Sequence, residues 1–311
     1  MKAFKDINKL IDFLEIENIN QKKILKNSSF PLFIPYRLAK KIKKNDLTDP
    51  IFLQFVPLEK ENKTLKNFSK DPLKESFFKK GNLLKKYNNR ALLITSNYCA
   101  MNCRYCFRRF FEKNINNNFD DEIDLIKKDK TINEIILSGG DPLSLSNYKL
   151  KDLLLKLNDI KHIKKIRFHS RYIIADPLRI DENFIKILKL IKKQIIFVFH
   201  INHINELDID ILNAFKLLSS NNYLLFNQSV LLKNVNDSFE ALSKLYELLF
   251  EKNVIPYYLH QLDEIQGAMH FKVSIKKGKE LIKGLRENVS GYMIPKYVKE
   301  KPFEKNKTLI F

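Results

Sequence analysis

Three cysteines are the residues of this chain whose type and spacing most plainly suggest chemistry. Cys99, Cys103 and Cys106 form a C-x3-C-x2-C pattern, and the sequence holds 3 cysteines in all. Four-iron clusters usually take four thiolates, so three thiolates on one loop would leave one iron open to a small molecule. The alternatives are a zinc ion held by these cysteines and a distant histidine, or three buried thiols without a function. The clustering predicts a metal or redox site.

Polar, chemically capable side chains also follow each of six apolar runs. These polar segments are Cys99–Cys106, Ser138–Asp141, His169–Arg171, His200–His203, Asn227–Ser229 and His260–Asp263. In barrels of alternating strands and helices, the active site lies at the carboxyl ends of the strands. We therefore expect the six segments to surround one site.

The elements that would position these segments follow from hydrophobic periodicity. The apolar runs predict strands at Ala91–Ile94, Glu134–Leu137, Lys165–Phe168, Ile195–Phe199, Leu224–Asn227 and Ile255–Leu259. Helical spacing predicts helices at Leu150–Leu157, Phe184–Ile191, Ile209–Leu218 and Phe239–Phe250. Because this alternation produces parallel strands with right-handed crossovers, the sequence predicts an α/β fold, a partial (β/α)6 TIM-like barrel.

Two further segments flank the predicted barrel. Residues 1–85 are expected to form a helical covering region, with helical spacing at Asp6–Leu14 and Tyr36–Lys44. Residues 86–285 hold the barrel, and residues 286–311 form a short C-terminal segment.

Composition narrows the class of protein. The formal net charge is +20, but the lysines are dispersed and no basic motif is interleaved with aromatic residues, so we do not expect a nucleic-acid partner. No apolar run approaches the roughly 20 residues of a membrane helix. The N-terminus lacks the apolar core of a secretory signal. We therefore expect a cytoplasmic protein that binds neither nucleic acid nor membrane.

The motif and its surroundings resemble a known family. C-x3-C-x2-C with an aromatic residue before the last cysteine is similar to the signature of the radical S-adenosylmethionine (SAM) superfamily. The order of further runs resembles the lysine 2,3-aminomutase family from about Leu84 to Lys307. These runs are Cys103–Arg109, Leu137–Leu143, Asn227–Leu232 and Pro256–Tyr258. Within that family the chain is most similar to the short bacterial branch that serves elongation factor P.

The resemblance implies an isomerase that converts L-lysine to (R)-β-lysine by moving the α-amino group to the β-carbon. It implies three cofactors, a [4Fe–4S] cluster, SAM and pyridoxal 5′-phosphate (PLP). The cluster would cleave SAM to a 5′-deoxyadenosyl radical that removes a β-hydrogen, and PLP would carry the migrating nitrogen. The implied partners are L-lysine, an electron donor protein and the elongation factor P pathway.

The resemblance also assigns the site residues. Cys99, Cys103 and Cys106 would hold the cluster, and Lys307 would be the catalytic lysine that binds PLP. The other assigned residues are Lys86, Tyr87 and Arg90 for PLP, Gly139, Gly140, Asp141, His200 and Gln228 for SAM, and Arg108, Asp263 and Glu300 for the substrate. Arg108 would pair with the substrate carboxylate, and the two acids would hold its ε-ammonium group. From composition alone, Lys305 competes with Lys307.

The chain departs from the clostridial members of the family in three places. Pro302–Asn306 stands where those members carry a glycine-rich run, which leaves open how the PLP phosphate is bound. Their C-terminal zinc cysteines are absent here, and Glu300 replaces an aspartate. Two other functions stay open, the same chemistry on another amino acid and a binding protein without catalysis. Asp263 with Glu300 favours a cationic substrate, and the intact cysteines favour an enzyme.

Overall fold

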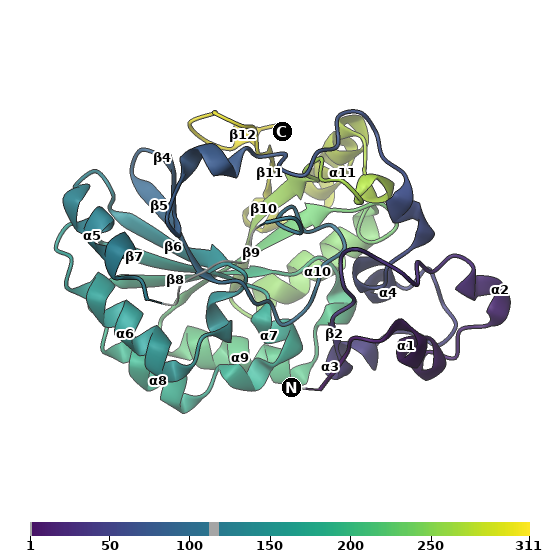
Figure 1. The fold of residues 1–311 in the computed structure, drawn as a ribbon, viewed down its shortest axis with the longest axis horizontal. Helices are drawn as coiled ribbons and strands as arrows, with labels where there is room; N and C mark the ends of the chain where they lie inside the picture. The colour runs from purple at the N-terminus through teal and green to yellow at the C-terminus, as the bar shows by residue number, and fades with distance from the viewer. Residues whose placement is uncertain (1, 112–117) are drawn as a thin grey trace.

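The computed structural model describes residues 2–111 and 118–311, and a curved sheet of ten strands forms its centre. Met1 and residues 112–117, which belong to the predicted segments 1–85 and 86–285, lie outside the described residues. The strands follow the order β12-β11-β10-β9-β8-β7-β6-β5-β4-β3. Figure 1 shows them curving in a partial ring with helices on its outer side.

Seven neighbouring strands of this sheet are parallel, and they contain all six predicted strands. They are β5 (Arg90–Ser96), β6 (Glu134–Gly139), β7 (Lys165–Ser170), β8 (Gln194–His200), β9 (Leu224–Leu231), β10 (Val254–Gln261) and β11 (Lys296–Lys299). The antiparallel strands β3 (Lys79–Lys80), β4 (Leu83–Tyr87) and β12 (Thr308–Leu309) extend the two edges. The predicted α/β fold with a partial barrel is confirmed.

Helices cover the outer face of the sheet. They are α5 (Asp120–Lys128), α6 (Asn147–Asn158), α7 (Tyr172–Ala175), α8 (Glu182–Lys189), α9 (Ile209–Ser220), α10 (Phe239–Glu251) and α11 (Ile275–Asn288). Five of them begin after a residue whose side-chain oxygen caps the first turn, namely Ser146, Asp181, Asp208, Ser238 and Ser274. The sequence analysis predicted α6, α8, α9 and α10 but not α5, α7 and α11.

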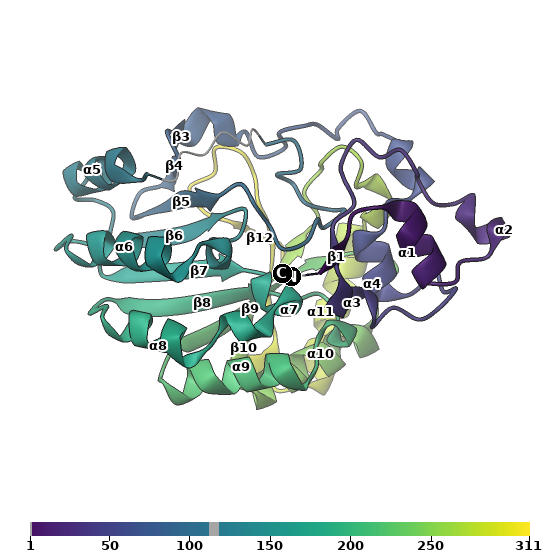
Figure 2. The same ribbon diagram turned by 60° about the horizontal axis from the view of Figure 1, so that its bottom comes forward.

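The N-terminal region packs beside the barrel, as Figures 1 and 2 show. It contains β1 (Ala3–Phe4), α1 (Ile7–Phe13), α2 (Asn18–Gln21), β2 (Ile34–Pro35), α3 (Tyr36–Ala39) and α4 (Pro50–Phe55). The predicted helix at Tyr36–Lys44 is shorter than expected, because regular helix ends at Ala39. The division into 1–85, 86–285 and 286–311 stays a prediction, and β4 runs across its first boundary.

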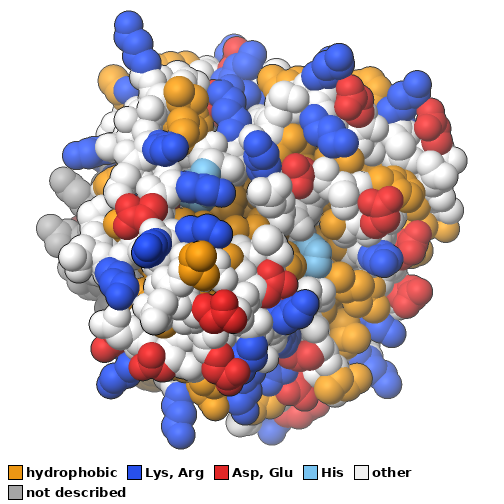
Figure 3. All heavy atoms as spheres, turned by 90° about the vertical axis from the view of Figure 1, so that its right-hand side faces the viewer, with side chains coloured by type: hydrophobic (Ala, Val, Ile, Leu, Met, Phe, Trp, Pro, Cys, Tyr) orange, Lys and Arg blue, Asp and Glu red, His pale blue; other side chains and the backbone are white. Residues whose placement is uncertain are grey.

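The surface distributes its charge widely. On the face drawn in Figure 3, Lys and Arg side chains lie among Asp and Glu side chains over the whole outline. Within the described residues, no helix is both long and apolar enough to span a membrane.

Candidate active site

One cavity of about 670 Å³ brings the predicted site residues together. All fifteen residues that the sequence assigned to the cluster, SAM, PLP or the substrate line it. Lys305 is exposed and is not part of the lining. The lining comes from every parallel strand from β5 to β10, from the cysteine loop and from both flanking segments.

The inner face of the sheet is polar because side chains alternate along each strand. On β7, Ile166 and Phe168 are buried on the helix side, whereas Arg167 and His169 line the cavity. The same spacing of two places Ser138 on β6, His200 on β8 and Gln228 on β9 along the cavity wall.

The cysteine loop follows β5 and presents three free thiols to the cavity. Burial raises the pKa of Cys99, and it raises the pKa of Cys106 to about 11 with a further contribution from the neighbouring Cys103 charge. Among the described residues, no three His, Cys, Asp or Glu side chains converge closely enough to hold a single metal ion. A four-iron cluster binds each cysteine to a different iron, and three free thiols along one cavity are ligands that such a cluster can take.

The N-terminal region holds the cysteine loop from outside. The Asn102 amide donates to Phe33 O at 2.9 Å, and the Arg104 amide donates to Gln54 O at 2.9 Å. The Arg104 side chain is fully buried and donates twice to Glu61, each time at 2.7 Å. Arg109 adds a bond to the same carboxylate at 2.9 Å. Glu61 thus anchors two arginines of the loop.

The loop after β6 is packed directly on the cysteine loop. A Cβ on Gly140 would lie 2.3 Å from Tyr98 O, and a Cβ on Gly139, whose φ is +110°, would lie 2.5 Å from Ile94 Cγ2. Only glycine fits at these positions. Of the two glycines, both assigned to SAM from the sequence, Gly140 therefore also lets the two loops come into contact, and Gly139 lets the loop approach Ile94 of β5.

Asp141 lines the cavity, but its carboxylate is bonded by the chain itself. It accepts from the Leu143 amide at 3.0 Å, the Ser170 hydroxyl at 2.7 Å and the Arg171 amide at 2.7 Å. Burial raises the pKa of Asp141 to about 6 although these bonds oppose the shift. The Asp141 side chain fixes the end of β6 to the end of β7, and its assignment to SAM stays a prediction.

In the C-terminal segment, Glu300 accepts hydrogen bonds from three of the residues predicted to bind PLP. Its carboxylate accepts from Lys307 Nζ at 2.6 Å, from the Tyr87 hydroxyl at 2.8 Å and from Lys86 Nζ. Burial opposes ionisation of Glu300, but the charges of Lys307 and Lys86 lower its pKa overall. Arg90 stacks on the Tyr87 ring, with its guanidinium carbon 4.1 Å from the ring centroid. Glu300 is thus a buried ion-pair partner, which its neighbouring lysines in the sequence did not suggest.

Asp263 and Arg108 differ in whether the protein supplies hydrogen-bond partners for their charged groups. Asp263 is partly buried, and no hydrogen bond to its carboxylate occurs within the described parts of the chain; burial raises its pKa to about 7. Arg108 instead donates to both oxygens of Glu75, at 2.8 and 2.7 Å. Glu75 belongs to the covering region and was not predicted as a site residue.

Two histidines of the cavity were located at strand ends by the sequence but received no role. Burial and the nearby Lys307 charge lower the pKa of both His169 and His260. The Nε2 atoms of His169 and His200 are buried without a hydrogen-bond partner in the described structure. Unpaired buried nitrogens of this kind are typical of a site that a ligand completes.

Comparisons with known proteins identify the family. Residues 93–271 match the model of the radical SAM superfamily. The chain is 40% identical over 287 residues to the L-lysine 2,3-aminomutase of Buchnera aphidicola, covering 90% of this chain and 84% of that protein. It is 39% identical over 313 residues to the L-lysine 2,3-aminomutase of Haemophilus influenzae, covering 99% and 93%.

A solved structure supports the fold. SuiB of Streptococcus suis bound to S-adenosylmethionine aligns with a TM-score of 0.52 at 16% identity, over 72% of this chain and 53% of that chain. Membership of the superfamily brings the [4Fe–4S] cluster and SAM as cofactors, which the three free thiols along the cavity fit. The chain belongs to the lysine 2,3-aminomutase family, a family of isomerases among the radical SAM enzymes.

Proposed function

We propose that this protein converts L-lysine to (R)-β-lysine with a [4Fe–4S] cluster, SAM and PLP, and that the product serves the modification of elongation factor P. The cluster and SAM supply one-electron chemistry that removes a hydrogen, and PLP supplies a conjugated carbonyl that can carry the migrating nitrogen. The protein's own residues bind, orient and shield the reacting groups.

The Asp263 carboxylate, which has no hydrogen-bond partner in the described structure, is the observation that favours lysine as the substrate. A carboxyl group in this cavity with no partner from the chain and a pKa near 7 is matched by a cation supplied by a ligand. The Glu300 carboxylate also acts on Asp263, but Lys307 and Lys86 already pair with Glu300, so Asp263 is the carboxylate left for the cation of a ligand. An amino acid with a long ammonium side chain supplies the cation, which supports lysine over a substrate with a neutral or acidic side chain.

Arg108 suits the other end of the substrate. It lines the cavity beside the cysteine loop, and its guanidinium already holds a carboxylate, that of Glu75, through two parallel bonds. This is the geometry that a substrate carboxylate would use. For the substrate to take that place, Glu75 must release Arg108.

Lys307 is the residue we propose for PLP. Its Nζ atom lies at the cavity and pairs with Glu300, which is placed to hold a proton released by the lysine, whereas Lys305 is exposed. Arg90 and Lys86 on the same wall supply the positive charge that a phosphate group favours. These donors replace a glycine-rich run as the proposed phosphate contacts.

The remaining roles are proposed by position. Gly139 and Gly140 allow close approach of backbone to the SAM amino group, while His200, neutral because burial lowers its pKa to about 3, and Gln228 can hydrogen bond with SAM. We infer that the enzyme works in the cytoplasm and receives its electron from a donor protein, as a reducible cluster requires.

The reaction is tested by reconstituting the protein anaerobically with iron and sulfide and supplying SAM, PLP, a reductant and L-lysine. Chiral amino-acid analysis should detect (R)-β-lysine only when both SAM and PLP are present. Asp263→Asn should lower kcat/KM for lysine about 100-fold, because it removes a buried partner of the ammonium group. Glu264→Gln is the matched control, since Glu264 is not part of the cavity lining and instead bonds to Lys272 at 3.0 Å.

Two outcomes would count against the proposal. SAM cleavage without β-lysine would leave the family assignment intact and overturn the substrate. Full lysine turnover by Asp263→Asn would overturn the role of Asp263 and reopen the same chemistry on another amino acid. The link to elongation factor P is tested separately, by mass analysis of that factor in cells with and without this protein.

A further inference from the structure

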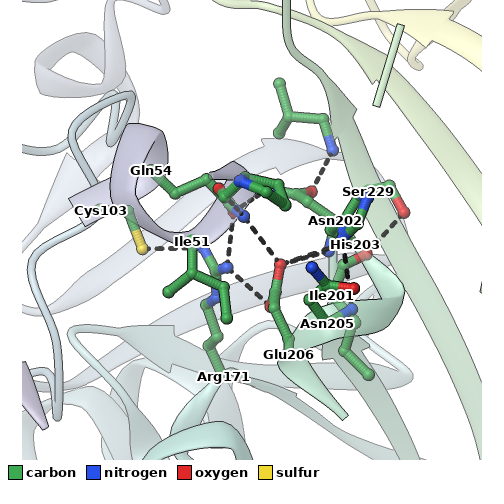
Figure 4. A network of polar contacts seen from close by, with 12 residues as sticks. Ile51, Gln54, Cys103, Arg171, Ile201, Asn202, His203, Asn205, Glu206 and Ser229 are labelled. Atoms are coloured by element: carbon green, nitrogen blue, oxygen red, sulfur yellow. Dashed lines mark hydrogen bonds and ion pairs between the residues drawn. The ribbon is translucent and has the colours of Figure 1, made fainter. Parts of the chain in front are cut away.

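A buried polar network reaches the sulfur of Cys103 at the wall of the cavity. Arg171 follows β7, and only 7% of its side chain is exposed. Its Nη1 atom donates to Cys103 Sγ at 3.0 Å and also to the Tyr105 hydroxyl. Figure 4 shows the guanidinium directed at the sulfur.

The guanidinium cannot easily turn away, because its Nη2 atom is also held, although its Nε atom has no hydrogen-bond partner in the described structure. Arg171 Nη2 donates to Gln54 Oε1 and to Glu206 Oε2, both at 2.8 Å. Gln54 belongs to α4, so the N-terminal region and the barrel grip the same group. Planar arginine forks held on several sides are rigid.

Glu206 is itself fixed. It is fully buried, and its Oε1 accepts from Gln54 Nε2 at 3.0 Å and from the amides of Asn202 and His203, each at 3.1 Å. Its second oxygen is the one that holds Arg171. The arginine and the carboxylate form a neutral pair whose cationic part faces the cysteine.

We propose that Arg171 is a positioning residue that donates a hydrogen bond to the Cys103 sulfur in the cluster-bound protein and raises the reduction potential of the cluster, and that Glu206 holds it there. Reduction adds negative charge to the cluster and its sulfur ligands, so a donor on a ligand sulfur stabilises the reduced form. The proposal requires only the cluster, so it stands or falls independently of lysine, PLP and elongation factor P.

The test measures the midpoint potential of the reconstituted cluster by a redox titration followed by electron paramagnetic resonance, without SAM, PLP or lysine. Arg171→Met combined with Glu206→Gln removes both charges together, so no uncompensated buried charge is left. We expect the equilibrium constant for reduction to fall about tenfold, which is about 59 mV for one electron.

Three further variants complete the test. Glu206→Gln alone leaves the arginine charge without its carboxylate, so the potential should rise. Arg179→Met removes a half-buried guanidinium whose hydrogen bonds within the described residues go to two backbone carbonyls, Leu143 O at 2.8 Å and Leu145 O at 3.2 Å, and it should leave the potential unchanged. Arg171→Lys alone keeps the positive charge, so its potential should fall by less than that of the double variant.

Equal midpoints in the wild type and the double variant, at equal iron content and equal melting temperature, would overturn the proposal. If the double variant does not retain iron, the single Glu206→Gln variant decides. A potential that falls or stays the same in that protein contradicts the proposal, and a rise supports it.

Discussion

The two sides of the cavity differ in how the chain satisfies their polar groups. The cysteine side consists of the buried ion pairs of Arg104 with Glu61 and of Arg171 with Glu206. Every one of these charges meets an opposite charge supplied by the protein. The positions of these groups are therefore set before any ligand arrives, which suits a side that must hold an assembled cluster in place.

The lysine side consists of Asp263, His169 and the Glu300–Lys307 pair. Within the described structure the Asp263 carboxylate and the His169 Nε2 atom lack hydrogen-bond partners. Buried groups of this kind are costly unless something pairs with them. The difference between the two sides teaches that the fold pairs the buried charges of its cluster end by itself and leaves the Asp263 carboxylate of its substrate end to be paired by a ligand.

The largest effect should come from breaking the cysteine side at Glu61. Glu61→Gln leaves the guanidinium groups of Arg104 and Arg109 buried without a carboxylate, so the free energy of unfolding should fall by about 3–5 kcal/mol. Urea unfolding of the iron-free protein measures it. Glu287→Gln removes a carboxylate from an exposed pair with Lys283 and should change stability by under about 0.5 kcal/mol. A loss below about 1 kcal/mol in Glu61→Gln would contradict the comparison.

On the lysine side, removing a charge should increase the stability of the ligand-free protein. Burial raises the pKa of Asp263 to about 7, above its value near 4 in the unfolded chain, so the folded state binds the proton more tightly. The stability from this group is fully present below about pH 4 and is lost as pH rises through 7. Relative to wild type, ligand-free Asp263→Asn should gain roughly 2 kcal/mol between about pH 5 and pH 8.

Thermal unfolding across that pH range makes the measurement. Asp124→Asn is the control, because its carboxylate lies on an exposed face of α5. Parallel pH curves for the wild type and Asp263→Asn would show that the chain satisfies Asp263 after all.

Local sequence patterns predicted much of the fold. The six strands could be found because each is a short apolar run followed by polar residues, and the cysteine spacing is itself local. The strands β4 and β11 were missed because their short runs carry lysines, which line the cavity or face solvent in this fold. Helix α11 was missed because its sequence, from Ile275 to Asn288, is rich in lysine and has only one narrow apolar face.

The site was predictable where a motif carried it and not where partners are distant. Gln54 meets Glu206 across 152 positions, and Arg104 meets Glu61 across 43. No local pattern marks such pairs, because the contact depends on how the covering region packs against the barrel. Glu75 was missed for the same reason, although it holds Arg108.

A smaller effect, on KM for lysine, is expected at the Glu75–Arg108 pair, where the two sides meet. If Glu75 occupies the place of the substrate carboxylate, Glu75→Gln weakens the competing bond and should lower KM for lysine about three- to tenfold, or about 1 kcal/mol. Steady-state kinetics make the measurement, and Arg108→Lys, which loses the bidentate fork, should raise KM instead. A rise in KM for Glu75→Gln would mean that Glu75 orients Arg108 and does not compete with the substrate.

The smallest effect concerns the C-terminal segment that closes the lysine side. Phe303 takes a left-handed backbone conformation with φ +64°, within the Pro302–Asn306 segment that departs from the glycine-rich run of the clostridial members. Its ring lies 5.5 Å from that of Phe77 and 5.6 Å from that of Phe78, which joins this segment to the covering region. Phe303→Ala and Phe303→Gly both lose these ring contacts, but only glycine also relieves the backbone strain.

We therefore expect the glycine variant to be about 1 kcal/mol more stable than the alanine variant in thermal unfolding. Wild type should lie close to the glycine variant, because the ring contacts offset most of the strain. An alanine variant as stable as the glycine variant would mean that this turn changes conformation when the ring is removed. The closure of the lysine side would then depend on the aromatic contacts and not on the backbone.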